Sequence, residues 1–254
     1  RRSSGLKSAV DTLRDQIGEW TSSRPRIHRN LKILESRLFG VTRPYATATR
    51  TRKRANDWIS RQSGNVFAWV HFMDVHVPYY PPQRFREETS CNDISDFEMV
   101  RLWQKLNTTP QDITDKELEQ LEHLYDATVR YVDEEIGNLV ETARQETNSE
   151  PIVAFTSDHG DEFRDHGGLT HSPKLYEELV HVPLIITSPD RSPETVQTPV
   201  SLMDIGPTLL SLVSANTEGM WGVDLRDQPD DRAVFSEVAQ APDDPNDDIS
   251  RDVR

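Results

Sequence analysis

The sequence predicts an α/β fold in which a mostly parallel sheet is sandwiched between helices. Short apolar runs of strand length, such as residues 66–70 and 182–186, alternate with longer stretches in which apolar residues recur at helical spacing. Strands that alternate with helices are typical of a parallel sheet covered on both faces. No linker rich enough in Gly, Pro or Ser splits the chain. We therefore expect one α/β core, over residues 61–240.

The part before the core is predicted to be helical and peripheral. Apolar residues recur at helical spacing within residues 1–60. Residues 66–72 then indicate a buried strand, followed at 73–82 by a rigid loop whose prolines exclude both helix and strand. Residues 86–113 are polar and irregular and predict a surface excursion.

A long amphipathic helix is predicted to begin at Thr114, because Thr114 and Glu117 have the spacing of a capping box. It should end near Asn148. The elements expected next are a buried strand (152–156), a polar loop (157–172), a short helix (173–180), a second buried strand (182–187), a helix (201–213) with Pro207 in its first turn, a last strand (233–238) and a mobile acidic tail (241–254).

The composition restricts the classes of partner. The net charge is −14, and Arg outnumbers Lys by 23 to 6. This balance predicts a halophilic protein, because salt screens the self-repulsion of an acidic chain; the alternative is that many soluble enzymes are simply acidic. Nucleic acid is not an expected partner, since phosphate backbones recruit basic surfaces.

Location and redox chemistry give weaker signals. No apolar run approaches the roughly eighteen residues that a membrane span needs, so no membrane segment is expected in this chain. No secretion signal is visible, and a cytoplasmic location is expected, although the chain begins at Arg1 without a Met and export stays open. Cys91 is the single cysteine, and its acidic surroundings argue against a reactive thiol.

Residues with functional chemistry gather on loops next to predicted strands. Asp158 and His159 directly follow the strand at 152–156, at the strand end where open α/β sheets bind ligands. His76, with Asp74 two residues before it, lies in the loop after the strand at 66–72. The remaining candidates are His166, His171, Lys174 and Asp204.

Each candidate also has a purely structural interpretation. Asp158 and Asp74 could cap turns, and Asp204 is better explained as a helix N-cap than as a ligand. Lys174 could be a solvated helix residue, and His166 could support a neighbouring ligand. The co-occurrence of several such residues on adjoining loops, with glycines that allow close backbone approach, favours a site.

The set of side chains suits an ester of an oxyanion. A divalent ion held by Asp158 and His159 would polarise such an ester. His76, His171 and Lys174 could supply protons or positive charge to its oxygens. Two protein ligands do not complete a metal site, because Ca²⁺ takes about six to eight oxygens.

The motifs His76-Val-Pro-Tyr79 and Ser157-Asp-His-Gly160, followed by the run at 201–210, occur in an order and spacing that resemble the sulfatase family of the alkaline phosphatase-like superfamily. The segment 67–82, with His76-Val-Pro-Tyr79, resembles the family's strand and HxPY loop. The segment 125–139 resembles its long helix, and Ser157-Asp-His-Gly160 with residues 166–186 resembles its metal-binding block. Residues 201–210 resemble the helix that follows. The resemblance implies an alkaline phosphatase-like α/β fold over about residues 60–240.

The resemblance also implies roles for individual residues. Asp158 and His159 match the second pair of ligands to a divalent metal, which would be Ca²⁺, Mn²⁺ or Mg²⁺. A His at the second position is similar to phosphonate monoester hydrolases and to the lipoteichoic acid synthase type, which favour Mn²⁺. His76 matches a substrate-binding histidine, and either His171 or Lys174 matches the basic group near the sulfate. The implied substrate is a small-molecule sulfate ester or a sulfated sugar.

Two features of the family pattern are absent from this sequence. It has neither an early strand ending in aspartates nor the Cys/Ser-x-Pro-x-Arg motif that supplies the nucleophile. We therefore expect an internal, incomplete piece of a sulfatase-like hydrolase that is inactive alone. Two alternatives stay open: a phosphoglycerol or phosphoethanolamine transferase of the same superfamily, and a non-catalytic binding module.

Overall fold

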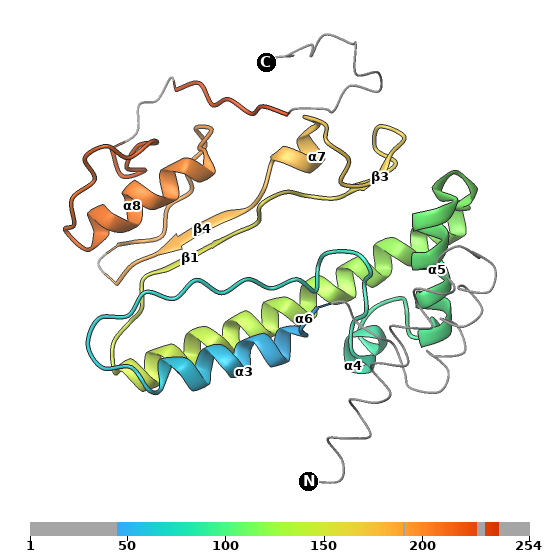
Figure 1. Ribbon diagram of the computed structural model, residues 1–254, viewed down its shortest axis with the longest axis horizontal. Helices are drawn as coiled ribbons and strands as arrows, with labels where there is room; N and C mark the ends of the chain where they lie inside the picture. The colour runs from blue at the N-terminus through green and yellow to red at the C-terminus, as the bar shows by residue number, and fades with distance from the viewer. Residues whose placement is uncertain (1–44, 190, 228–231, 239–254) are drawn as a thin grey trace, which may run out of the picture. The chain divides into compact units, whose positions relative to one another are not determined.

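The computed structural model describes residues 45–189, 191–227 and 232–238 (Figure 1). The chain divides into two compact units. Unit 1 combines Arg1–Arg54 with Ala68–Ile136, and unit 2 combines Ala55–Phe67 with Gly137–Arg254. Both helices and strands are present among the described residues, as the predicted α/β class requires.

The longest element is helix α6 (Asp115–Thr147), which contributes to both units. Its start confirms the predicted capping box. The Thr114 hydroxyl accepts from the Glu117 amide at 3.3 Å, and the Glu117 carboxylate accepts from the Thr114 amide at 2.9 Å. The helix ends one residue before Asn148, whose φ of 49° is the left-handed conformation that commonly follows a helix.

Helix α3 (Ala48–Ile59) lies along α6 (Figure 1). The Thr49 hydroxyl donates to the Glu135 carboxylate at 2.6 Å, and the Asn56 side-chain amide donates to the Thr142 hydroxyl at 3.1 Å. This helix confirms the last part of the helical region predicted for residues 1–60. The rest of that prediction, up to residue 44, lies outside the described residues.

The prediction of an irregular surface segment at residues 86–113 is wrong. Unit 1 forms helices α4 (Gln83–Glu87) and α5 (Asp96–Thr108) and the 3₁₀ turn η1 (Pro110–Asp112) there. Ser95 caps α5 by accepting from the Glu98 amide at 3.2 Å. Polar residues dominate the segment, but the apolar ones share a single buried face: Met99, Val100, Leu102 and Leu106.

Unit 2 contains both strands predicted around the polar loop. β1 (Val153–Thr156) pairs with β4 (Leu184–Thr187), with Val153 opposite Thr187 and Thr156 opposite Leu184. Within that loop, β2 (Glu162–Phe163) and β3 (Leu169–Thr170) form a short hairpin. Both pairs are antiparallel, so the parallel pairing expected of the sheet does not occur among the described strands. Buried strands were expected at both places, but the residues of β1 are all half-buried and those of β4 alternate between half-buried and exposed.

Two of the predicted strands do not form. Residues 66–72 and 233–238 are irregular, and their large side chains face solvent, with Phe67 74%, Trp69 82% and Phe235 70% exposed. A strand needs a neighbour that satisfies its amides and carbonyls. No described strand pairs with either segment. The acidic tail predicted for residues 241–254 lies outside the described residues.

The last helices confirm the prediction for residues 201–213. They are η2 (Leu202–Asp204) and α8 (Ile205–Leu212), and Pro207 is in the first turn of α8. Asp204 was expected to be a helix N-cap, and it occupies that position of α8, but its side chain makes no cap hydrogen bond there. Its buried carboxylate instead accepts from the Ser201 amide at 2.7 Å, in the capping box of η2, and from both terminal nitrogens of Arg232. In the described parts of the chain, no helix combines the length and apolar character of a membrane span.

Candidate functional site

The turn after β1 is held by backbone contacts with the helix α7 (Glu177–Val180). The Gly160 amide donates to the Leu179 carbonyl at 2.9 Å, and a Cβ on Gly160 would lie only 2.0 Å from the Glu178 carbonyl oxygen. The Ser157 hydroxyl adds a hydrogen bond to the His159 carbonyl at 2.7 Å. Only glycine fits at position 160 without moving backbone, so this packing fixes the turn that carries Asp158 and His159.

Asp158 and His159 present their metal-binding atoms side by side. His159 Nδ1 donates to the Gly160 carbonyl at 2.9 Å, which fixes the ring and leaves Nε2 as the nitrogen that can bind a metal. Asp158 Oδ1 lies 3.9 Å from that Nε2, and 70% of the Asp158 side chain is exposed. A carboxylate and an imidazole held this way fit part of a divalent metal site.

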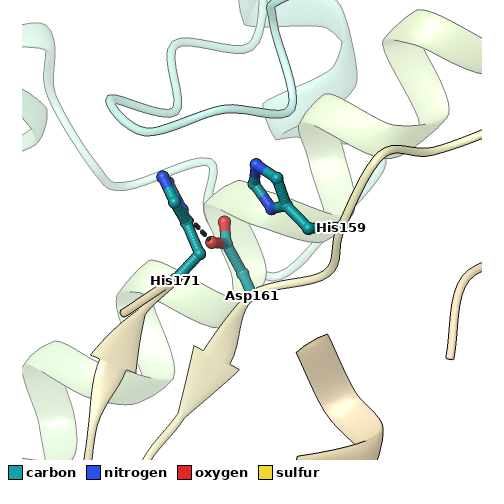
Figure 2. A group of neighbouring side chains, drawn as sticks. All are labelled: His159, Asp161 and His171. Carbon is teal, nitrogen blue, oxygen red and sulfur yellow. Dashed lines mark hydrogen bonds and ion pairs between the residues drawn. The ribbon is translucent and has the colours of Figure 1, made fainter. Parts of the chain in front are cut away.

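A second group of donors lies next to His159. Ring nitrogens of His159 and His171 and a carboxylate oxygen of Asp161 lie within 4.8 Å of one another (Figure 2). His171 Nδ1 donates to Asp161 Oδ1 at 2.8 Å, and the two histidine rings are 4.3 Å apart between centroids. Two imidazoles and a carboxylate are a donor set that suits divalent transition metals. The structure thus brings two predicted residues together, and adds Asp161.

Lys174 forms an ion pair with a different carboxylate, that of Glu162. Its Nζ is 3.2 Å from Glu162 Oε2, and Glu162 is fully buried. Glu162 Oε1 also accepts from the Gly168 amide at 2.5 Å and the His166 amide at 3.0 Å. Burial opposes ionisation of Glu162, but the Gly168 and Lys174 hydrogen bonds outweigh it and lower the pKa of the carboxyl.

His166 supports the loop instead of joining the donor group described above. Its Nδ1 donates to Glu178 Oε1 at 2.6 Å, and its ring is stacked on Tyr176 at 3.8 Å between centroids. These contacts tie the tip of the β2–β3 hairpin to α7. Neither Glu178 nor Tyr176 is a candidate ligand, so support of a neighbouring ligand by His166 stays a prediction.

His76 belongs to unit 1, whereas the residues above belong to unit 2. Its Nδ1 donates to the Val77 carbonyl at 2.6 Å. The Tyr45 hydroxyl is 2.6 Å from the His76 carbonyl oxygen and 2.8 Å from that of Pro78, so it clamps the loop from outside. Asp74 in the same loop is buried. The half-buried His76 ring is therefore held in a defined orientation within its own unit.

Cys91 does not behave as a functional thiol. It is buried within unit 1, with Sγ 2.9 Å from the Thr89 hydroxyl. Burial raises the pKa of the thiol, because the thiolate would lose its hydration. This agrees with the unreactive cysteine expected from the sequence.

Asp161 and Glu162 are the site residues that sequence reasoning missed. Two adjacent acids in a polar loop look like a solvated turn, and nothing in their spacing marks them. Their burial follows from the β2–β3 hairpin and from the basic side chains of His171 and Lys174, which reach back to them from ten and twelve residues further on. The one available signal was the presence of those cations in the same loop.

Comparison with known proteins connects this loop to a family. Residues 8–215 match the sulfatase family, so the match extends further toward the N-terminus than the motifs at 60–240. The chain is 27% identical over 186 residues to the uncharacterized sulfatase YidJ of Escherichia coli (strain K12), covering 68% of this chain and 37% of that protein.

Two further relatives have names that state a substrate class. Choline-sulfatase of Rhizobium meliloti (strain 1021) is 32% identical over 162 residues, which are 59% of this chain and 31% of that protein. Arylsulfatase K of Danio rerio is 31% identical over 176 residues, which are 66% of this chain and 29% of that protein. The chain therefore spans about a third of the length of these curated relatives.

Proposed function

The chain belongs to the sulfatase family, and we propose that the whole protein hydrolyses sulfate esters with the help of a divalent metal ion. One observation carries the proposal. At the end of β1, a carboxylate and an imidazole with a fixed tautomer present their metal-binding atoms 3.9 Å apart. Strand ends of this kind are where α/β folds bind ligands.

Asp158 and His159 are the proposed ligands. A divalent ion held there would supply Lewis acidity to the ester oxygens. The hydrogen bond from His159 Nδ1 to the Gly160 carbonyl directs Nε2 toward the ion and keeps the ring from rotating. In this proposal Asp161 binds His171 and is not a metal ligand, because its Oδ1 already accepts a hydrogen bond from the His171 ring. The donor set admits Ca²⁺, Mn²⁺ or Mg²⁺, and the imidazole favours Mn²⁺ among them.

Basic residues of the two predicted loops are the candidates to bind and orient the sulfate group. His171 and Lys174 are the two basic candidates in unit 2, and His76 is the candidate from unit 1. Positive groups that face the sulfate oxygens stabilise the charge that develops as the ester bond breaks. The packing around Gly160 would keep the turn that carries Asp158 and His159 in place without reorganisation during the reaction.

The proposed substrate class is a small-molecule sulfate ester or a sulfated sugar. It is supported by the names of two relatives, a choline-sulfatase and arylsulfatase K. The present 254 residues contain no Cys/Ser-x-Pro-x-Arg motif. We therefore propose that this chain alone binds substrate or metal but does not turn substrate over.

The test is a turnover assay on the complete gene product with p-nitrophenyl sulfate and choline sulfate, before and after treatment with a chelator. Metal-dependent release of sulfate is expected from the wild-type protein. The 254-residue chain, assayed in parallel, is expected to release none. Sulfate release that survives complete removal of metal, or a complete protein that releases sulfate from neither of these esters nor from sulfated sugars assayed beside them, would contradict the proposal.

A further inference from the structure

The side chain of Tyr45 holds the backbone of the loop that carries His76. Its hydroxyl lies 2.6 Å from the His76 carbonyl oxygen and 2.8 Å from the Pro78 carbonyl oxygen. Tyr45 and His76 both belong to unit 1, although 31 positions separate them in the chain. We propose that Tyr45 is a positioning residue for sulfate ester hydrolysis, which acts on the substrate only through the orientation of His76. This inference rests on the proposed function, in which His76 is a candidate to bind the sulfate group.

The two carbonyls that Tyr45 binds lie on either side of the group that orients the His76 ring. His76 Nδ1 donates to the Val77 carbonyl at 2.6 Å. A carbonyl only accepts, so this contact fixes the hydrogen on Nδ1 and restricts rotation of the ring. The ring thus takes its orientation from the Val77 carbonyl, and that carbonyl is held in place by the backbone before and after it, which Tyr45 binds.

The composition of the loop explains why a side chain has to supply this support. Residues 73–82 include three prolines, which have no amide hydrogen to donate to a carbonyl. None of the described strands includes these residues, so no sheet holds their backbone. A hydrogen bond from the His76 amide to the Met73 carbonyl at 3.1 Å forms the turn at the start of the loop. The Tyr45 hydroxyl supplies a donor just after that turn, where carbonyls withdrawn from water need one.

This clamp contributes little to folding and more to geometry. A hydroxyl has a single hydrogen, which Tyr45 shares between two carbonyls, so its loss removes only a modest interaction. In contrast, a shift of about 1 Å in a group that contacts the substrate can lower the rate about 10²-fold. Removal of the Tyr45 hydroxyl should therefore affect the reaction more than the stability of the protein.

The test is a double-mutant cycle on the complete protein, at a temperature at which every variant is folded. The substrate is the ester hydrolysed fastest among p-nitrophenyl sulfate, choline sulfate and sulfated sugars. Tyr45→Phe should lower kcat/KM by about tenfold in the wild-type background. In the His76→Ala background the same change should alter kcat/KM by less than about twofold, because no imidazole is left to orient.

Tyr131→Phe is the matched control in unit 1. The Tyr131 hydroxyl also has two contacts, at 2.8 Å to the Thr49 amide nitrogen and at 2.8 Å to the Thr49 hydroxyl, and its side chain is buried. Thr49 belongs to α3 and not to the His76 loop. Both Tyr→Phe variants should lower Tm by about 2–4 °C. Only Tyr45→Phe should lower kcat/KM, whereas Tyr131→Phe should stay within about twofold of wild type.

The outcomes separate the inference from the proposed function. Wild-type kcat/KM in Tyr45→Phe or in His76→Ala overturns the inference. Equal losses from Tyr45→Phe in the two backgrounds, or equal losses from Tyr45→Phe and Tyr131→Phe, also overturn it, because they show a general structural role. In each of these cases hydrolysis by the wild-type protein leaves the sulfatase proposal standing. A wild-type protein that releases sulfate from none of the esters overturns the proposed function instead, and the inference falls with its premise.

Discussion

Two loops carry the residues with predicted functional roles, and they are held by different forces. Residues 157–176 of unit 2 follow a formed strand, and carboxylates inside the loop bind its basic side chains: Asp161 with His171, and Glu162 with Lys174. Residues 73–82 of unit 1 follow an apolar run that forms no strand. There the clamp is aromatic, since Tyr45 binds two loop carbonyls and Tyr79 packs edge-on against Tyr125 at 5.4 Å. A loop can thus be held in place whether or not the strand before it forms.

The difference predicts how each loop responds to substitution. The unit 2 loop depends on close backbone packing and on carboxylates paired with basic side chains inside the loop, so single changes should have large effects. The unit 1 loop depends on contacts that are individually modest, so single changes should have small ones. Stability measurements on the 254-residue chain can test this contrast without any assay of activity.

The largest effect is expected from Gly160→Ala. The new Cβ would lie 2.0 Å from the Glu178 carbonyl oxygen, so α7 or the turn after β1 must move. We expect a loss of about 3 kcal/mol in the free energy of unfolding, measured by urea denaturation. Gly137→Ala is the matched control, because a Cβ on Gly137 contacts nothing within 4 Å inside α6, and it should stabilise by up to about 1 kcal/mol. Equal effects at the two positions would contradict the proposed packing.

The next effect concerns the start of α6 in unit 1. Burial opposes the charge of Glu117, but hydrogen bonds from Lys105 and Thr114 outweigh it and lower the pKa to about 2 from an ordinary value of 4.5. The stabilisation from this carboxylate is therefore complete above about pH 4.5 and is lost as the pH falls toward 2. Glu117→Gln should cost about 2 kcal/mol at pH 7 and flatten the acid limb of the stability profile.

The control for this prediction is Glu119→Gln, on the exposed face of the same helix. It should leave both the stability at pH 7 and the shape of the acid limb unchanged. A Glu117→Gln protein that keeps the wild-type pH dependence between 4.5 and 2 would show that another group is responsible for it.

A smaller effect is expected where the unit 1 loop is clamped. Tyr45→Phe removes the hydroxyl that reaches the His76 and Pro78 carbonyls, and should cost about 1 kcal/mol. Tyr176→Phe in the unit 2 loop keeps the ring stacked on His166 and should change stability by less than about 0.5 kcal/mol. If Tyr45→Phe were as damaging as Gly160→Ala, the contrast between the loops would fail.

Salt should have the mildest effect, and it acts on both units together. With a net charge of −14, screening of self-repulsion should raise Tm between 0.1 and 2 M KCl. Chloride is the appropriate anion, because sulfate would also report on binding at the proposed site. A Tm that falls across this range would argue against the halophilic interpretation of the composition.

The sequence predicted the elements whose signals are local. The capping boxes of Thr114 with Glu117 and of Ser201 with Asp204 each depend on two residues three positions apart. The strands β1 and β4 were also predicted correctly, and each apolar run has the other as its pairing partner. Helix α5 was missed although Ser95 and Glu98 carried the same kind of start signal. The strands expected at 66–72 and 233–238 failed because a strand depends on a partner elsewhere in the chain, which an apolar run does not specify.

The residues of the candidate site likewise fall into those that a local sequence pattern identified and those that depend on the fold. Asp158, His159, His171 and Lys174 were identifiable because a strand end, histidines and a lysine in one loop are a local pattern. Their partners Asp161 and Glu162 were not, because burial of an acid depends on the hairpin that folds over it.

The most direct test of the central claim is the metal content of the complete protein, measured by mass spectrometry after dialysis against Mn²⁺ and then metal-free buffer. The claim is that Asp158 and His159 hold a divalent ion while Asp161 serves His171. Wild-type protein and Asp161→Asn should retain the metal, and the double variant D158N/H159A should bind it at least about tenfold more weakly while keeping its circular dichroism spectrum. Full metal retention by D158N/H159A, or loss of metal from Asp161→Asn alone, would contradict the assignment.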